Sequence, residues 1–500
     1  MRNTNVKNEK GITLIVLVIT VVILFILSLL VVDFTVDGKL FKTANELGAK
    51  GEAQQTETET LRNSWKDMLG LTNTTTNNNT TGNTTGGNTT GNNTTGDNTT
   101  GGETTCTHTS TTATDNGDGT HTITCTNCGK QITTEKHNYV NRKCTKCGAQ
   151  KLAVAGEKTT ETLEFTDSDG NKAIIPKGFT VSKADDEKTI EKGLVIYLIN
   201  DKKEEQIKSI NWNDEETLNN LKKTYDQFVW IPVQNVNKMF MCQSKTANTE
   251  CDIKLVNGIP TCTNHSNSTQ MAGRLYATEA GENFDSSLIA QTYNNDEGDN
   301  LREPEKLSSN LVDQEQEQNL DVQTEYNNAV KKVIESKGFW IGRYETSGID
   351  SSNDDTAVNI VAGKGTSNGT DQFSWYRMYK QQQNYASKKN LETSKTQSTM
   401  IFGAAYDQTI IFANCANKTT SRKDYGSVKT GNVEDDCYKN IYDLCGNLYE
   451  WTTEARSDSF RAYRGGNWNS SVSSSYRNSD YPQNNYSATY GSRTTLYVTL

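Results

Sequence analysis

Four cysteines in two close pairs have the residue type and the spacing to bind a metal ion. They are Cys125, Cys128, Cys144 and Cys147, which follow the pattern C-x2-C-x15-C-x2-C. This spacing is typical of structural zinc sites, in which each sulfur lies at about 2.3 Å from the ion. A glycine follows each pair, where the chain must turn sharply so that its amides can face the thiolates. The pattern therefore predicts one structural zinc ion bound by four thiolates.

Nearby residues leave other arrangements open. Cys106, His108 and His137 could join in a second, mixed metal site, whereas His121, in DGTHTIT, is better explained as a strand residue. Disulfides formed by cross-pairing are the alternative if the segment lies outside the cell, where disulfides persist. A zinc-ribbon-like module over residues 106–150 is too small to fold by burying apolar side chains, so metal binding would supply most of its folding free energy.

The uncharged segment from Gly11 to Val32 is long and apolar enough to cross a bilayer as a helix. The basic residues Arg2, Lys7 and Lys10 precede it, which places the N-terminus in the cytoplasm and the bulk of the chain outside. We therefore predict a single-pass protein of the cell membrane.

The same segment resembles the leader of type IV prepilins, because a short charged head and a glycine precede ITLI and an unbroken apolar run. The resemblance implies cleavage between Gly11 and Ile12. Val16 stands at the fifth mature position, where pilins usually carry the glutamate that helps to register subunits in a fibre. The alternative is an uncleaved signal anchor, which would also tether the chain to the membrane.

Composition divides the chain into several parts. Residues 72–105 are mostly Asn, Thr and Gly without an apolar side chain, which predicts a flexible linker. The formal net charge of -10 is spread along the 500 residues without a basic patch, which argues against a nucleic-acid partner. The predicted parts are a prepilin-like leader and transmembrane helix at 1–33, a juxtamembrane stalk at 34–71, the linker at 72–105, the zinc-ribbon-like module at 106–150, a short-strand lead-in region at 151–223 and a C-terminal domain at 224–500.

The C-terminal domain is organised around a stretch from Asn440 to Trp468 that reads NIYDLCGNLYEWT and then YRGGNW. With GSR at 491–493 and the upstream blocks FVWIPV, GFWIGRYETS and TMIFGAAYDQTIIF, it resembles the formylglycine-generating-enzyme/sulfatase-modifying factor family. The resemblance covers residues 224–500 and implies an α+β domain with a C-type-lectin-like fold.

Members of this family hold two kinds of metal ion, and the resemblance carries only one of these sites over to this chain. The oxygen-activating members hold copper with a cysteine pair after the R-G-G segment, but those positions fall on Ser470 and Ser475 here. A hydroxyl is a poor ligand for Cu(I), so no catalytic residue is predicted. The G-N-x-x-E block implies a calcium site at Asn447 and Glu450. The alternative is that Glu450 pairs with an arginine such as Arg464 or only caps a turn.

The last segment, Asn467 to Tyr490, is rich in Asn, Ser and Tyr. Tyrosine provides amphipathic contact area and Ser and Asn provide adaptable hydrogen bonds, a mixture that antibody binding loops also use. The segment also resembles the variable segment of proteins that retroelements diversify, although family members that are not diversified are rich in Asn and Ser here too. The predicted ligand-binding residues are Trp468, Asn469, Tyr476, Asn478, Tyr481, Asn485, Tyr486 and Tyr490.

Together these patterns predict a membrane-tethered bacterial surface protein that binds an unidentified extracellular protein or glycan and performs no catalysis. Zinc and calcium are the expected cofactors. Two other classes remain open, namely an enzyme of the sulfatase-modifying type and a minor pilin-like structural subunit. Copper binding with turnover of a cysteine-containing peptide would support the first class, and recovery of the processed chain in sheared fibres would support the second.

Overall fold

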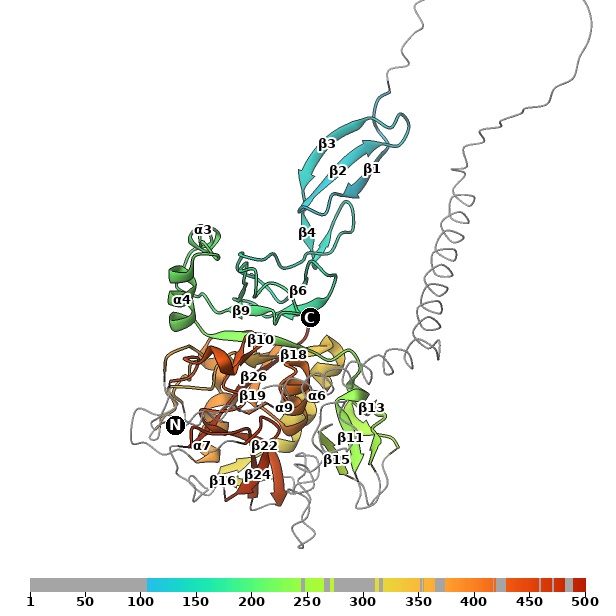
Figure 1. Cartoon of the computed structure of the whole chain (residues 1–500). Coiled ribbons are helices and arrows are strands. Elements are labelled where there is room, and N and C mark those ends of the chain that lie inside the picture. The colour runs from blue at the N-terminus through green and yellow to red at the C-terminus, as the bar shows by residue number, and fades with distance from the viewer. Residues whose placement is uncertain are drawn as a thin grey trace, which may run out of the picture. The chain divides into compact units, whose positions relative to one another are not determined.

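The computed structural model describes the chain from Cys106 onwards, with several gaps (Figure 1). The predicted leader with its cleavage site at Gly11 and Ile12, the stalk and the linker lie outside the described residues. Within the described part, no helix has the length and hydropathy needed to cross a membrane. The residues described are 106–243, 248–264, 270–273, 311–313, 318–350, 353, 355–364, 374–416, 418–419, 429–457, 460–469, 472–481 and 489–500.

The largest sheet in the described part has six antiparallel strands in the order β19-β26-β18-β10-β9-β8. The blocks FVWIP and GFWIG form two of these strands and are buried at almost every position, as expected for strands covered on both faces. The bounds are β8 (Thr180–Val181), β9 (Val195–Tyr197), β10 (Gln227–Pro232), β18 (Gly338–Gly342), β19 (Thr396–Met400) and β26 (Thr494–Val498).

Two hydrophobic clusters lie on opposite faces of this sheet, because successive side chains of a strand point to opposite faces. Trp230 and Trp340 belong to one cluster, with ring centroids 5.1 Å apart, whereas the neighbouring Phe339 belongs to the other. Helices α6 (Val322–Ser336) and α9 (Gly403–Phe412) contribute to the second cluster. The sheet and its two faces therefore form the core of the C-terminal domain.

A four-stranded sheet in the order β24-β23-β22-β25 carries the motifs nearest the C-terminus. Glu450 on one strand lies opposite Arg464 on the next, so the YEW and YRGG motifs are neighbours in space. The bounds are β22 (Tyr449–Ser457), β23 (Phe460–Arg464), β24 (Arg477–Asp480) and β25 (Tyr490–Ser492), and β25 runs parallel to β22.

Residues 151–223, predicted as a short-strand lead-in to the C-terminal domain, contribute strands and buried side chains to the same core as that domain. β8 and β9 extend the six-stranded sheet. Buried Glu187 accepts hydrogen bonds from Arg343 at 2.7 Å and from the hydroxyl of Tyr197 at 2.9 Å. The sequence pattern does not show that these strands extend the sheet of the C-terminal domain, because β8 and β9 have only two and three residues.

Among the described residues both strands and helices occur and strands outnumber helices, which confirms the predicted α+β class. The remaining elements are short. They are β1 (Thr111–Asp115), β2 (Thr120–Cys125), β3 (Gln131–Lys136), β4 (Tyr139–Val140), β5 (Lys143–Cys144), β6 (Leu163–Thr166), β7 (Lys172–Ile175), α3 (Glu204–Lys208), α4 (Glu215–Thr224), η1 (Val236–Lys238), β11 (Phe240–Gln243), β12 (Asn248–Glu250), β13 (Ile253–Val256), β14 (Ile259–Cys262), β15 (Gln270–Gly273), β16 (Leu311–Asp313), β17 (Gln318–Leu320), α7 (Trp375–Gln383), α8 (Tyr385–Lys388), η4 (Glu434–Asp436), β20 (Cys437–Tyr438) and β21 (Ile441–Tyr442).

Gly193 is a position that tolerates no larger residue. Its φ is +95°, and a Cβ there would overlap the carbonyl oxygen of Lys439. We expect Gly193→Ala to destabilise the domain by at least about 2 kcal/mol more than Gly170→Ala, because both changes incur left-handed strain but only the first also clashes with backbone. Gly170 is the matched control, since its φ is +84° and a Cβ at this residue would meet nothing within 4 Å. Urea denaturation measures the difference, and equal stabilities of the two variants would contradict the prediction.

Candidate metal centre

The Cys and His side chains of residues 106–150 form two clusters. Within each cluster the four candidate ligand atoms lie within 4.8 Å of one another, so each cluster could hold a metal ion. The first cluster contains Cys106, His108, Cys125 and Cys128, and the second contains His121, His137, Cys144 and Cys147.

This grouping corrects the predicted single site with four thiolates. The two C-x-x-C pairs lie in different clusters, and each pair is completed by residues from elsewhere in the chain. Cys106 and His108 join the first pair, whereas His137 and His121 join the second. Sequence spacing defined each pair correctly, but it could not show which strands bring the other ligands to it. His121 is indeed a strand residue, and it is also a candidate ligand.

The same sharp turn follows the first cysteine of each pair. The amide of Gly129 donates to the carbonyl of Cys125 at 2.9 Å, and the amide of Gly148 donates to the carbonyl of Cys144 at 2.9 Å. The φ values of the two glycines are +72° and +74°, in the left-handed region that favours glycine. This geometry turns the backbone around each cysteine pair, as the sequence predicted.

In the first cluster, the sulfur of Cys106 lies 3.4 Å from that of Cys125, and the sulfur of Cys128 lies 3.4 Å from Nδ1 of His108. A hydrogen bond with His108, together with the amides of Cys128 and Asn127, lowers the pKa of Cys125 to about 6. The thiolate is the form that binds metal ions, so these contacts favour a metal ligand at this position.

In the second cluster, the sulfur of Cys144 lies 3.7 Å from Nδ1 of His121, and the sulfur of Cys147 lies 3.5 Å from Nε2 of His137. The two imidazole rings stack with centroids 5.3 Å apart. Burial alone would raise the pKa of Cys144, but the amides of Cys147 and Lys146 lower the pKa of this thiol below its ordinary value. The second cluster thus also stabilises a thiolate.

Each histidine of the second cluster has its other ring nitrogen near a further polar side chain. Nδ1 of His137 lies 2.6 Å from the hydroxyl of Tyr139, and Nε2 of His121 lies 3.8 Å from a carboxylate oxygen of Glu135. Metal-bound histidines are usually oriented by such outer partners, which fix the ring and raise its basicity. The surroundings of both histidines therefore suit metal ligation.

Replacing Glu135 with Gln is expected to weaken metal binding at the second cluster by about 10–100-fold if the carboxylate, 3.8 Å from Nε2 of His121, orients this ring when the metal is bound. Competition with a chromophoric chelator measures the affinity. Glu161→Gln is a matched control, since Glu161 pairs with Lys151 at 2.6 Å outside both clusters. Equal affinities for the Glu135→Gln variant and the control would show that Glu135 does not support the site.

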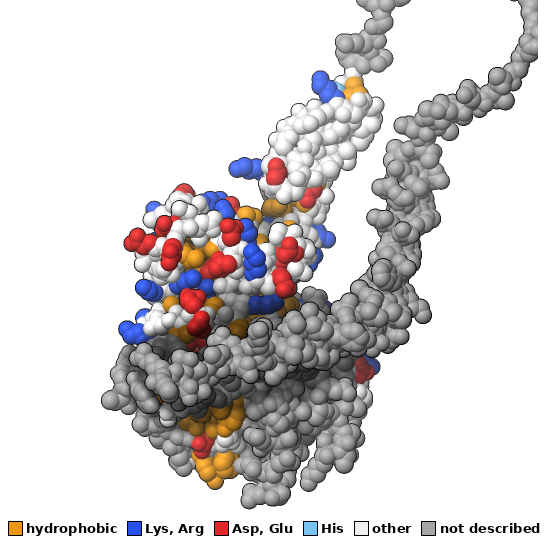
Figure 2. Space-filling view, in the orientation of Figure 1, with side chains coloured by type: hydrophobic (Ala, Val, Ile, Leu, Met, Phe, Trp, Pro, Cys, Tyr) orange, Lys and Arg blue, Asp and Glu red, His pale blue; other side chains and the backbone are white. Residues whose placement is uncertain are grey.

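Residues 106–150 bury almost nothing except candidate ligands. His121, Cys125 and Cys144 are the buried side chains of this range, with exposed fractions of 1%, 1% and 3%. Ile132 and Val140, by contrast, are 43% and 57% exposed. On the face shown in Figure 2, the surface of this segment consists mainly of backbone and of side chains that are neither hydrophobic nor charged. Apolar burial is too small to offset the conformational entropy of about 1–2 kcal/mol per ordered residue.

Asn447 and Glu450, the residues predicted to bind calcium, have other partners. Nε of Arg493 lies 3.0 Å from each carboxylate oxygen of Glu450, and Asn447 donates to the carboxylate of Glu345. Glu450 belongs to no group of three or more His, Cys, Asp or Glu side chains at metal-binding distance among the described residues. Glu450 is thus the acid of a buried ion pair, with Arg493 in place of the Arg464 that the sequence suggested.

The Asn/Ser/Tyr-rich segment is only partly on the surface. Asn469, Asn478 and Tyr481 are exposed, and Trp468 and Tyr476 are half-buried. Asn485 and Tyr486 lie outside the described residues. Tyr490 is only 8% exposed and stacks on Trp451 with centroids 4.8 Å apart, so its predicted place on a binding surface is wrong. Apolar contact with the four-stranded sheet explains its burial.

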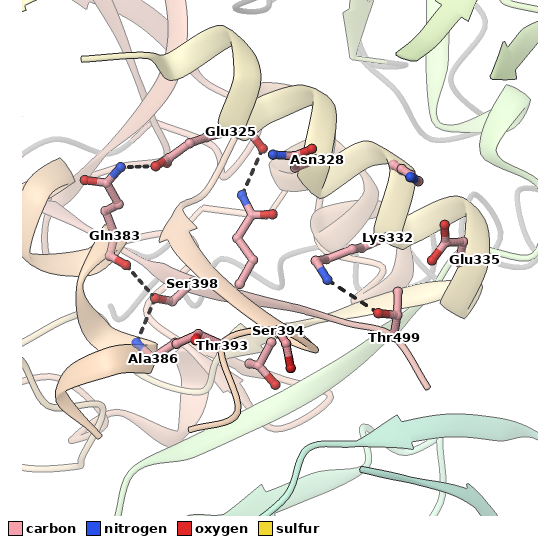
Figure 3. Close-up of a pocket in the computed structure, with 13 residues that line it drawn as sticks. Glu325, Asn328, Lys332, Glu335, Gln383, Ala386, Thr393, Ser394, Ser398 and Thr499 are labelled. Carbon is pink, nitrogen blue, oxygen red and sulfur yellow. Dashed lines mark hydrogen bonds between the residues drawn. The ribbon is translucent and has the colours of Figure 1, made fainter. Parts of the chain in front are cut away.

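A polar pocket of about 550 Å³ lies between α6, β19 and the segment that follows α7 (Figure 3). Some of its polar side chains bond to one another. Gln383 donates to the carboxylate of Glu325, which also accepts a hydrogen bond at 2.7 Å from Tyr379 outside the pocket lining, and Lys332 donates to the hydroxyl of Thr499 at 3.4 Å. The pocket therefore contributes an internal polar network, and it presents no metal-binding cluster among the described residues.

Glu325 should make stability depend on pH. Burial raises the pKa of this carboxyl to about 7, above its ordinary value of 4.5. A carboxyl with a raised pKa in the folded state stabilises the fold when protonated, and this contribution is lost as the pH rises from about 4.5 towards 7. We expect the stability of Glu325→Gln, relative to the wild type, to improve between pH 5 and pH 8. Urea denaturation at the two pH values tests this, and a constant difference would contradict it.

No protein-family model, curated protein or solved structure matches this chain. The two Cys/His clusters are the best-defined site in the described part of the chain.

Proposed function

We propose that residues 106–150 form a structural module folded around two zinc ions, one in each cluster. The first cluster offers three thiolates and one imidazole, and the second offers two of each. Zinc takes four such ligands in a tetrahedron, whereas calcium and magnesium prefer oxygen. Four protein ligands leave no open position for a substrate, so the role of each ion is structural.

One observation carries this proposal, which is that the buried side chains of the module are themselves candidate ligands. A segment with a conventional core would bury Ile132 and Val140, which are exposed here. Metal coordination is the interaction that remains to fold the segment, as in small zinc-dependent domains.

Metal analysis of the purified full-length chain tests the zinc proposal. The expected result is two zinc ions per chain, with both sulfur and nitrogen neighbours in X-ray absorption spectra. One zinc ion per chain with only sulfur neighbours would instead support the single site with four cysteines that the spacing predicted. A metal-free chain with disulfides, such as one between the adjacent Cys106 and Cys125, would overturn the proposal in favour of the disulfide alternative.

For the whole chain, we infer a membrane-tethered bacterial surface protein whose C-terminal domain has a C-type-lectin-like fold and binds an extracellular protein or glycan. The motif resemblance to the formylglycine-generating family and the exposure of Asn469, Asn478 and Tyr481 support this inference. The catalytic alternative has less support, because Ser475 is buried and bonds to Ser473 at 2.8 Å where that family's enzymes carry a copper ligand.

Capture of extracellular material by the full-length chain tests the binding proposal. Replacing Asn469, Asn478 and Tyr481 together with Ala is expected to abolish capture and to leave the domain folded. A small loss of thermal stability is expected, because Tyr481 also packs on Phe460 with ring centroids 4.0 Å apart. If the wild type and the triple variant capture the same partner equally well, the binding surface does not include these three residues.

A further inference from the structure

We propose that the two metal sites are energetically coupled through strand β2, so that an ion in either cluster strengthens binding at the other. This inference rests on the proposed function, because it requires both clusters to bind metal.

Strand β2 supplies one ligand to each cluster. His121 belongs to the second cluster and Cys125 to the first, and they are the two buried positions of the strand. β2 is also the middle strand of the sheet β1-β2-β3. Any shift or fraying of β2 would therefore displace a ligand of both sites at once.

Strand β1 makes the same connection from the other side. Its residues Thr111 and Asp115 pair in register with Cys125 and His121. A carboxylate oxygen of Asp115 also lies 3.5 Å from Nε2 of His137 in the second cluster. The strand thus extends from the neighbourhood of one cluster to that of the other.

Coupling follows from this shared scaffold, because little besides the candidate ligands is buried in the segment. The first ion to bind must order β1, β2 and β3, which costs conformational entropy. The second ion then meets strands that are already ordered and does not incur that cost again. Such a difference in ordering makes two sites cooperate without any direct contact between the ions.

The test titrates the metal-free full-length chain with Zn²⁺ in competition with a chromophoric chelator. The variant Cys144→Ser/Cys147→Ser removes the second site, and Cys106→Ser/His108→Ala removes the first, while neither changes β2. Thr145→Ala is the control, since this exposed residue lies between the two cysteines of a pair and is not a candidate ligand.

The wild type and the control are expected to bind two ions with a Hill coefficient above one. Each double variant should bind its remaining ion about 5–150-fold more weakly, and the two losses should be equal, because coupling between binding sites is reciprocal. Cobalt in place of zinc identifies the site that remains, since a site with three thiolates absorbs more strongly than one with two. Protection of the β10 and β18 amides from hydrogen exchange shows that the C-terminal domain of each variant is folded.

The outcomes separate the two proposals. If each double variant keeps its remaining site at wild-type affinity, the coupling is overturned and the two-zinc module stands. If the wild type binds fewer than two ions, the proposed function fails as well. Loss of all zinc from both variants, while the control binds two ions, supports the coupling in its strongest form.

Discussion

Chelation of metal from the full-length chain is expected to unfold residues 106–150 and to leave the C-terminal domain folded. Structural zinc contributes about 10–16 kcal/mol of apparent binding free energy in small zinc-dependent peptides. Nothing of comparable size replaces it here, because His121, Cys125 and Cys144 are the buried side chains of the segment. The C-terminal domain has two extensive hydrophobic clusters and does not depend on these ions.

Hydrogen exchange with mass spectrometry distinguishes the two regions. After chelation, peptides from β2 and β3 should exchange at the rate of an unfolded chain, whereas peptides from β10 and β18 should remain protected. Addition of zinc should restore the protection of β2 and β3. Protection of β2 that survives complete removal of metal would show that the segment folds without it.

The Arg493→Ala variant is expected to lose about 3–5 kcal/mol of folding free energy, the usual cost of leaving a buried charge without its partner. Arg493 is fully buried and contacts both carboxylate oxygens of Glu450. Its guanidinium also donates to the carbonyls of Gly342 at 3.0 Å and Tyr442 at 2.8 Å. A small side chain at this position would leave all of these acceptors unsatisfied.

The folding free energy lost in the Arg493→Ala variant should depend on pH in a defined direction. Burial raises the pKa of Glu450, and Arg493 opposes this rise. Without the arginine the folded-state pKa rises further, so the folded state binds more protons than the unfolded state and stability falls as the pH rises. The destabilisation should therefore be larger at pH 8 than at pH 5, as measured by urea denaturation.

Two further variants control this experiment. Adding Glu450→Gln to Arg493→Ala should recover part of the stability at pH 8, because the unpaired charge is gone. Lys188→Ala, which breaks a 2.5 Å ion pair with Asp185 between exposed side chains, should cost only about 0–1 kcal/mol. A cost for Arg493→Ala no greater than that of Lys188→Ala would show that the buried pair does not stabilise the domain.

Features that the local sequence pattern determines can be predicted from the sequence. FVWIP and GFWIG are buried strands because their apolar runs suit a sheet covered on both faces. The glycines after each cysteine pair turn as expected, because few other residues adopt their positive φ. The α+β class was what the family resemblance implied, and the mixture of strands and helices in the described part agrees with it.

The sequence could not predict contacts between distant segments. Strands β3 and β4 lie between the two cysteine pairs, and Cys144 ends β5. Nothing in the spacing of the pairs shows that His121 joins the second pair while Cys125, on the same strand, belongs to the first. Tyr490 was misplaced because composition does not distinguish an exposed tyrosine from one that packs on Trp451. The pairing of Glu450 with Arg493 depends in the same way on a long-range contact.

The position of β26 has a consequence for biosynthesis. This strand, Thr494–Val498, lies between β18 and β19 in the six-stranded sheet, although it is made more than ninety positions later than β19. While the ribosome is still translating the preceding residues, β18 and β19 lack their shared neighbour and the sheet has a gap. Completion of the six-stranded sheet must therefore wait until β26 has left the ribosome, and a premature stop codon before Thr494 should yield a product that proteases degrade.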